Sequence, residues 1–174
     1  SISKVHFPVD HAQHIDFFSE WWYINLVLDV KAVDSQETQK LAYIISFSRI
    51  ANSGGLLSSR FDTKTQNFSQ STIPGRVEGL LLDNLLKVSF SYSGFANLYL
   101  EEQSPLDNGA NIYLLNGFTP KIGTINLTLQ ENGVNIDNEP LLWGDQTRCD
   151  GNISVFTPRD SYYYSIPNLD ISGT

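Results

Sequence analysis

Methionine, cysteine and clustered basic residues are missing or scarce in this 174-residue sequence. There is no Met, not even an initiator, which predicts that the chain is a processed or trimmed piece of a longer protein. A single cysteine, Cys149, excludes an internal disulfide framework. The 11 Lys and Arg against 19 Asp and Glu give a net charge of −8. With no basic cluster, the sequence argues against binding to nucleic acid or to an anionic membrane surface.

Long apolar runs and helical periodicity are missing as well. No run approaches the roughly 18 apolar residues of a membrane-spanning helix, so we expect no transmembrane segment. No secretory pre-sequence is present, and the localisation of a soluble chain stays open between cytoplasmic and secreted or periplasmic. Without a Pro/Gly/Ser linker or an internal repeat, we predict one domain over 1–174. It divides into an N-terminal arm, 1–19, and a barrel, 20–174.

Alternation of apolar and polar residues with period two is the dominant pattern, and it predicts strands. The clearest strands are expected at 20–29, 41–49, 86–92 and 124–130, with shorter ones at 55–61, 95–101, 111–116, 153–156 and 161–171. Turn residues separate them at 52–55, 74–75, 93–94, 105–109 and 131–133. Eight or nine short antiparallel strands predict an all-β sandwich or barrel.

The first two strands predict an ion pair on the inside of the barrel. If 31–40 is the hairpin loop, folding about its middle places Trp22 opposite Arg49, with Glu20 diagonal to Arg49 on the same face. That face also carries most of the large apolar residues of both strands, so it should be the interior. A charged Arg49 there needs a partner, and Glu20 is the nearest acid. The alternative is that Arg49 reaches solvent at the strand end.

Three segments together resemble a known family. They are the opening run from Phe7-Pro-Val-Asp-His11 to Ser19-Glu-Trp-Trp-Tyr23, the Arg-terminated strand 41–49, and the segment 160–173 with its three consecutive tyrosines. They are similar, in this order, to the AttH-like lipocalin family, which includes the carotenoid hydratases (hydroxyneurosporene synthases) and is related to fungal Diels–Alderase-type cyclases. The resemblance implies an antiparallel lipocalin-like β-barrel, or calyx. It also implies that this chain is the first half of a two-barrel protein.

The resemblance leaves two classes of function open. The first is half of a cyclase, isomerase or hydratase that acts on a polyene, isoprenoid or polyketide and needs no cofactor, because holding reacting groups in place itself lowers the barrier. The second is a non-catalytic carrier of a lipid-like, hydrophobic small molecule. Polar groups inside the cavity favour the enzyme, whereas a purely apolar lining favours the carrier. In both cases the resemblance implies a second lipocalin-like domain as partner, in cis or as another chain.

The candidate catalytic residues are Glu20, His14 and Asp145. An imidazole titrates near neutrality, and a carboxylate beside tryptophan can act as an acid or base. The alternative for Glu20 and His14 is an arm whose polar groups cap the barrel. Asp145 belongs to a polar, Gly-flanked segment that reads either as a loop over the cavity mouth or as a plain surface loop.

The candidate ligand-binding residues are Trp22, Tyr23, Arg49, Tyr162 and Tyr164, which we expect to line or gate the cavity. Their alternative role is packing within the barrel. No metal site is expected, although His11, His14, Asp16 and Glu20 are of metal-ligating types. Transition metals need more converging imidazoles or thiolates than this segment supplies.

Overall fold

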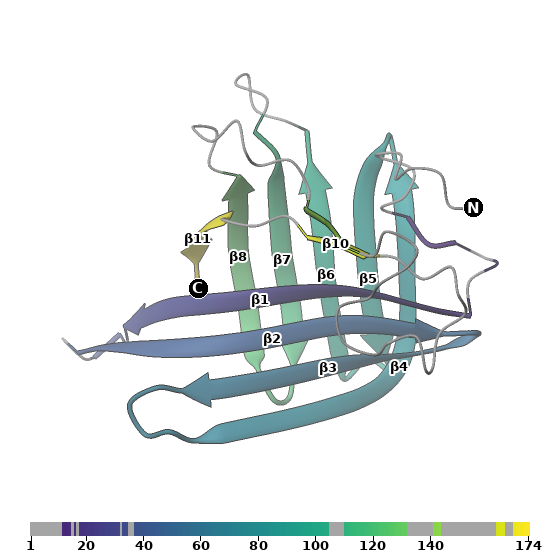
Figure 1. Cartoon of the computed structure of the whole chain (residues 1–174). Coiled ribbons are helices and arrows are strands. Elements are labelled where there is room, and N and C mark those ends of the chain that lie inside the picture. Colours follow the sequence, from purple (N-terminus) through teal and green to yellow (C-terminus); the bar gives the residue numbers. More distant parts are fainter. Residues whose placement is uncertain are drawn as a thin grey trace.

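The chain is all-β in every part that the computed structural model describes, namely 12–14, 16, 18–31, 33–34, 37–104, 110–131, 141–143, 163–165 and 169–174. Nine antiparallel strands form one sheet in the order β1-β2-β3-β4-β5-β6-β7-β8-β11. The sheet curls so that β1–β3 cross in front of β5–β8, which makes a nearly closed barrel (Figure 1). This confirms the predicted antiparallel, lipocalin-like architecture.

The strands are long at the start of the chain and shorter later. Their bounds are β1 (Ser19–Lys31), β2 (Thr38–Ile50), β3 (Ser53–Asp62), β4 (Phe68–Leu82), β5 (Leu85–Tyr92), β6 (Ala96–Gln103), β7 (Ile112–Thr119), β8 (Gly123–Glu131), β9 (Leu141–Trp143), β10 (Tyr163–Ser165) and β11 (Leu169–Gly173). The predicted strand 161–171 is in fact two strands, because β10 pairs with β9 while β11 pairs with β8. The predicted strand 153–156 and turn 105–109 lie outside the described residues.

The register of β1 and β2 differs from the predicted one by two residues. Glu20 lies directly opposite Arg49, and Trp22 lies opposite Phe47. The strands extend into the predicted loop, because Lys31 pairs with Thr38. Next to it, Asp29 and Lys40 form a cross-strand ion pair with a 2.8 Å Oδ1–Nζ distance. A shift of two residues keeps every side chain on its face, so the predicted interior face is correct. The residue directly opposite Arg49 is Glu20, however, and not Trp22 as predicted.

Pro74 and Gly75 do not form the predicted turn but lie inside β4, at a corner of the barrel. β4 pairs with β3 through Gly75 and with β5 from Arg76 onward. A Cβ on Gly75 would lie 2.6 Å from the Ser91 main-chain oxygen, so the chain passes here only as glycine. Glycine is typical of such corners, because two backbones approach closely where a strand changes sheet.

Two of the remaining turn predictions can be compared with the structure. The turn at 93–94 is confirmed between β5 and β6, where Ser93 and Gly94 both have positive φ. The turn predicted at 52–55 lies earlier, because Ile50 already pairs with Ser53. Ala51, with φ of 51°, therefore occupies the tight connection between β2 and β3.

The core lies on the inner face of the barrel and is built from aliphatic and aromatic side chains of most strands of the main sheet. Its largest fully buried members are Phe47, Phe90, Ile45, Leu56, Leu98, Leu115, Leu129 and Val88. Trp22 packs against this cluster from β1. Burial of this apolar surface is the main source of stability of the fold.

Candidate functional site

The row of interior side chains on β2 ends in a buried ion pair. Arg49 follows Ile45 and Phe47 on the inward face, and its side chain is only 9% exposed, as is that of Glu20 on β1. Arg49 donates to Glu20 Oε2 from Nη2 at 2.6 Å and from Nε at 3.0 Å. The contact between these two groups confirms the predicted Glu20–Arg49 pair.

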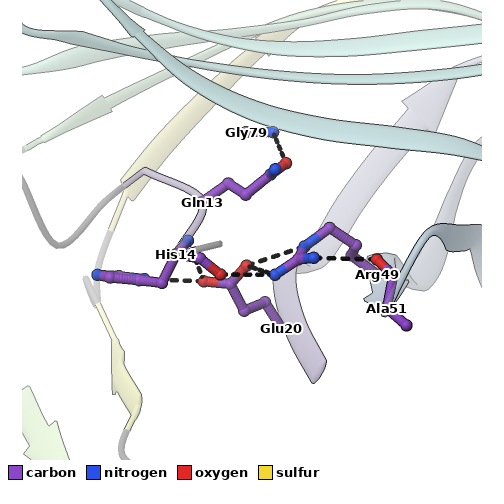
Figure 2. Close-up of polar contacts among 6 residues, drawn as sticks. All are labelled: Gln13, His14, Glu20, Arg49, Ala51 and Gly79. Carbon is purple, nitrogen blue, oxygen red and sulfur yellow. Dashed lines mark hydrogen bonds and ion pairs between the residues drawn. The ribbon is translucent and has the colours of Figure 1, made fainter. Parts of the chain in front are cut away.

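Arg49 also binds two main-chain carbonyls, and so it ties three segments together. Its Nη1 donates to the Ala51 carbonyl at 3.0 Å, and its Nη2 donates to the His14 carbonyl at 2.7 Å (Figure 2). The planar guanidinium carries five N–H groups in fixed directions, which a lysine cannot match. Arg49 therefore holds the His14 main chain and the β2–β3 connection as well as neutralising Glu20.

The second oxygen of the Glu20 carboxylate holds His14. Oε1 accepts the His14 main-chain N–H at 2.7 Å and lies 2.8 Å from the ring Nδ1. Because an ionised carboxylate only accepts hydrogen bonds, we infer that Nδ1 carries the hydrogen of this contact. The imidazole is 28% exposed, so the carboxylate orients a partly accessible base.

Residues 12–14, called the strap below, connect this pair to β4. The Gln13 main-chain N–H donates to the Gly79 carbonyl at 2.8 Å, and the Gly79 N–H donates to Gln13 Oε1 at 3.5 Å. Trp22 lies against the same glycine, since a Cβ there would be 2.7 Å from Trp22 Cη2. We call Gln13, His14, Glu20, Arg49, Ala51 and Gly79 the corner cluster (Figure 2).

The other predicted site residues are not brought to the corner cluster by the described part of the chain. Tyr23 alternates with Trp22 and shares the outward face of β1 with the exposed Asn25. Tyr164 lies in β10, opposite Leu142 of β9. Tyr162 and Asp145 lie outside the described residues. The ligand-binding and catalytic roles of these four residues stay predictions.

A second polar group inside the barrel, at Glu102, was missed by the sequence reasoning. Glu102 continues the inward row Leu98, Leu100 on β6, and it accepts the Leu86 N–H at 2.9 Å. Burial raises the pKa of Glu102, the Leu86 hydrogen bond opposes this, and the charge of Glu131 raises it further. The available signal was a carboxylate that continues an apolar alternation, which is unusual for an acidic residue.

No set of three or more His, Cys, Asp or Glu side chains within the described segments is grouped to bind a metal ion. The same segments include no helix with the length and apolarity to span a membrane. Comparison of the chain with protein-family models, with curated proteins and with solved structures gives no match. The resemblance to the AttH-like family therefore stays a hypothesis, and the site has to be interpreted from its own geometry.

Proposed function

We propose that this chain binds an apolar small molecule in its barrel, as the first half of a cofactor-independent cyclase, isomerase or hydratase that acts on a polyene, isoprenoid or polyketide. One observation carries the proposal: the apolar interior row ends in the buried Glu20–Arg49 pair, to which an imidazole is attached. Apolar walls select a ligand by shape, and a few polar groups among them orient it. The sequence resemblance gives the substrate class.

His14 would be the group that moves a proton. With Nδ1 bonded to Glu20, the ring presents Nε2 as the base, or as the acid once it is protonated. Glu20 would act as a positioning residue that fixes the tautomer, and Arg49 would hold the Glu20 carboxylate in place. Isomerisation of a conjugated chain removes a proton at one carbon and returns a proton at another. Hydration adds a proton to one carbon, and the water that bonds to the other carbon loses a proton, which the same imidazole could accept.

The binding test uses the two adjacent tryptophans. All-trans-retinol, an isoprenoid polyene, should quench tryptophan fluorescence in a saturable way. Trp22→Phe should remove most of the quenching, because Trp22 faces the interior, whereas the matched control Trp21→Phe on the outer face should keep it. Absence of saturable quenching in the parent, or equal quenching in both variants, would contradict binding inside the barrel.

A carrier function is the second candidate, because the core cluster consists of aliphatic and aromatic side chains and includes no charged group. The two functions differ in what happens to the bound molecule. Incubation with polyene and polyketide candidates, followed by mass spectrometry of the extract, should show a rearranged or hydrated product for the enzyme. His14→Gln should then keep binding and lose product. Recovery of every ligand unchanged favours the carrier.

The second barrel domain is also part of this proposal. It is supported by a cross-strand row on the outer face of β1–β4, in which Val27, Ala42, Phe61 and Phe68 are register neighbours. The first, third and fourth of these side chains are exposed. The chain expressed alone should self-associate, and Phe61→Ser with Phe68→Ser should reduce this more than Phe118→Ser on β7. A monodisperse monomer would contradict this part of the proposal.

A further inference from the structure

The strap lies where β4 leaves its pairing with β3. That pairing ends at Gly75, and the next part of β4 pairs with β5 on its other side. At Gly79 the N–H and the carbonyl are both bonded by Gln13 of the strap. Beyond the point where β3 ends its pairing, the strap thus takes the place of a neighbouring strand at one residue of β4, Gly79.

The other end of the strap is held by β1 and β2. His14 donates its main-chain N–H to Glu20 and accepts from Arg49 through its carbonyl, while its ring contacts Glu20. Two adjacent residues therefore bridge β4 to the first two strands, as Figure 2 shows. The bridge reaches β4 in the part that pairs with β5 and no longer with β3.

The two ends of the strap are held with unequal strength. The His14 end is bonded to two buried charged groups over 2.7–2.8 Å. The Gln13 end has one neutral bond of 2.8 Å and a second, longer one of 3.5 Å. Charge-assisted hydrogen bonds are shorter and stronger than neutral ones. The Gln13 end should therefore release first, with the His14 end as the hinge.

Trp22 contacts Gly79, the residue to which the weaker, Gln13 end of the strap is bonded. Its ring rests on the α-carbon of Gly79, where any side chain would collide with it. Movement of Gly79 therefore removes the surface against which the ring packs, and Trp22 is only partly buried. Gln13 and Trp22 thus both contact the same glycine.

We propose that the strap is a gate, and that release of Gln13 from Gly79 lets an apolar molecule pass Trp22 into the barrel between β1 and β4. This inference rests on the proposed binding function, and it adds the route of access. A closed gate raises the barrier between the bound and free states, and weakening the gate lowers that barrier without changing the free-energy difference between the two states. Association and dissociation rates should therefore rise by the same factor when the gate is weakened.

The experiment uses the full chain with Gln13→Pro, which deletes both the main-chain donor to the Gly79 carbonyl and the Oε1 acceptor of the Gly79 N–H. Gln70→Ala on the exposed outer part of β4 is the control. Stopped-flow mixing with all-trans-retinol measures both rates, and hydrogen exchange measures the Gly79 amide. We expect both rates and the Gly79 exchange to rise at least about fivefold, the effect of losing one neutral hydrogen bond of ordinary length together with a second, longer one. The Gln70 variant should match the parent.

The outcomes separate the gate from the binding function. Absence of saturable retinol binding in the parent overturns the proposed function. Gly79 exchange that is the same in the parent and in Gln13→Pro overturns the strap, whether or not retinol binds. Faster Gly79 exchange with unchanged retinol rates shows that the strap is a brace and not a gate, and it also overturns this inference.

Discussion

Replacement of Arg49 by leucine is the sharpest test of the corner cluster. The substitution removes the cation that faces Glu20, and it also leaves the Ala51 and His14 carbonyls without their Arg49 donor. His14 would still donate to Glu20, so the carboxylate keeps one partner. Breaking a buried ion pair by removing one member costs about 3–5 kcal/mol, because the remaining charge stays buried.

This loss is large for a domain whose total stability is expected to be about 5–15 kcal/mol. In a chain of this length it corresponds to a fall in Tm of roughly 6–20 °C. Urea unfolding followed by tryptophan fluorescence measures the free energy of unfolding directly. The matched control is Arg76→Leu, because Arg76 pairs with Glu78 on the exposed side of β4 and should lose about 1 kcal/mol or less.

Two results would refute this reasoning. The first is a cost for Arg49→Leu within 1 kcal/mol, on the order of the control's, since the pair would then be energetically superficial. The second comes from the double variant Glu20→Leu with Arg49→Leu. Removing both charges avoids an uncompensated buried carboxylate, so the double variant should be more stable than Arg49→Leu alone. If it is instead less stable by the full sum of the two single losses, the two charges are not coupled.

Three further predictions concern other interior or turn positions. Gly79→Ala should cost about 1–3 kcal/mol and change the near-ultraviolet circular dichroism of Trp22, because the new Cβ overlaps the ring. A hydrogen bond from Gln39 is the main cause that lowers the pKa of Asp62 to about 2. The ionised Asp62 therefore stabilises the fold fully above the unfolded pKa of about 3.9, and this stabilisation is lost as the pH falls toward about 2. Asp62→Asn should flatten that part of the stability curve. For Glu102, whose pKa is raised, stability should fall as the pH rises from the unfolded value through the folded one, and Glu102→Gln should remove this fall.

Controls and contradicting results for these three differ. Gly55→Ala is the control for Gly79→Ala, because its nearest contact is the Ile73 main-chain oxygen at 3.3 Å and not a ring; equal losses would remove the overlap argument. For Asp62 and Glu102, urea unfolding between about pH 2 and 7, the range in which carboxyl groups titrate, measures how the free energy of unfolding depends on pH. Identical pH dependence in parent and variant would show that the carboxylate has the same pKa in the folded and unfolded chain.

Much of the fold could be predicted because an alternation of apolar residues is a local property of the sequence. It located most strands and identified the inward faces of β1 and β2. It also predicted the Glu20–Arg49 pair, although the predicted register of β1 against β2 was wrong by two residues. That error was harmless for the site, because the face of a side chain depends on whether its position is odd or even and not on the exact register.

The sequence did not predict β4, because the row of apolar side chains on the inward face of this strand is incomplete. Two of its inward positions, Gly75 and Gly79, are glycines, and rings from other strands fill the space that their side chains would occupy. The Phe90 ring lies against Gly75, and the Trp22 ring lies against Gly79. The apolar pattern of this strand is therefore completed by residues that are distant in sequence, and no local window contains it.

What the sequence determined by itself is the class of the fold, the inward faces and the charge that needed a partner. All of these follow from side-chain chemistry repeated along neighbouring residues. Only the tertiary structure decided that the strap bonds Gly79, that His14 shares Glu20 with Arg49, and that Glu102 points inward beside the Leu86 amide. These contacts join segments separated by 6 to 66 residues. Their formation depends on how the sheet closes, which is a property of the whole chain.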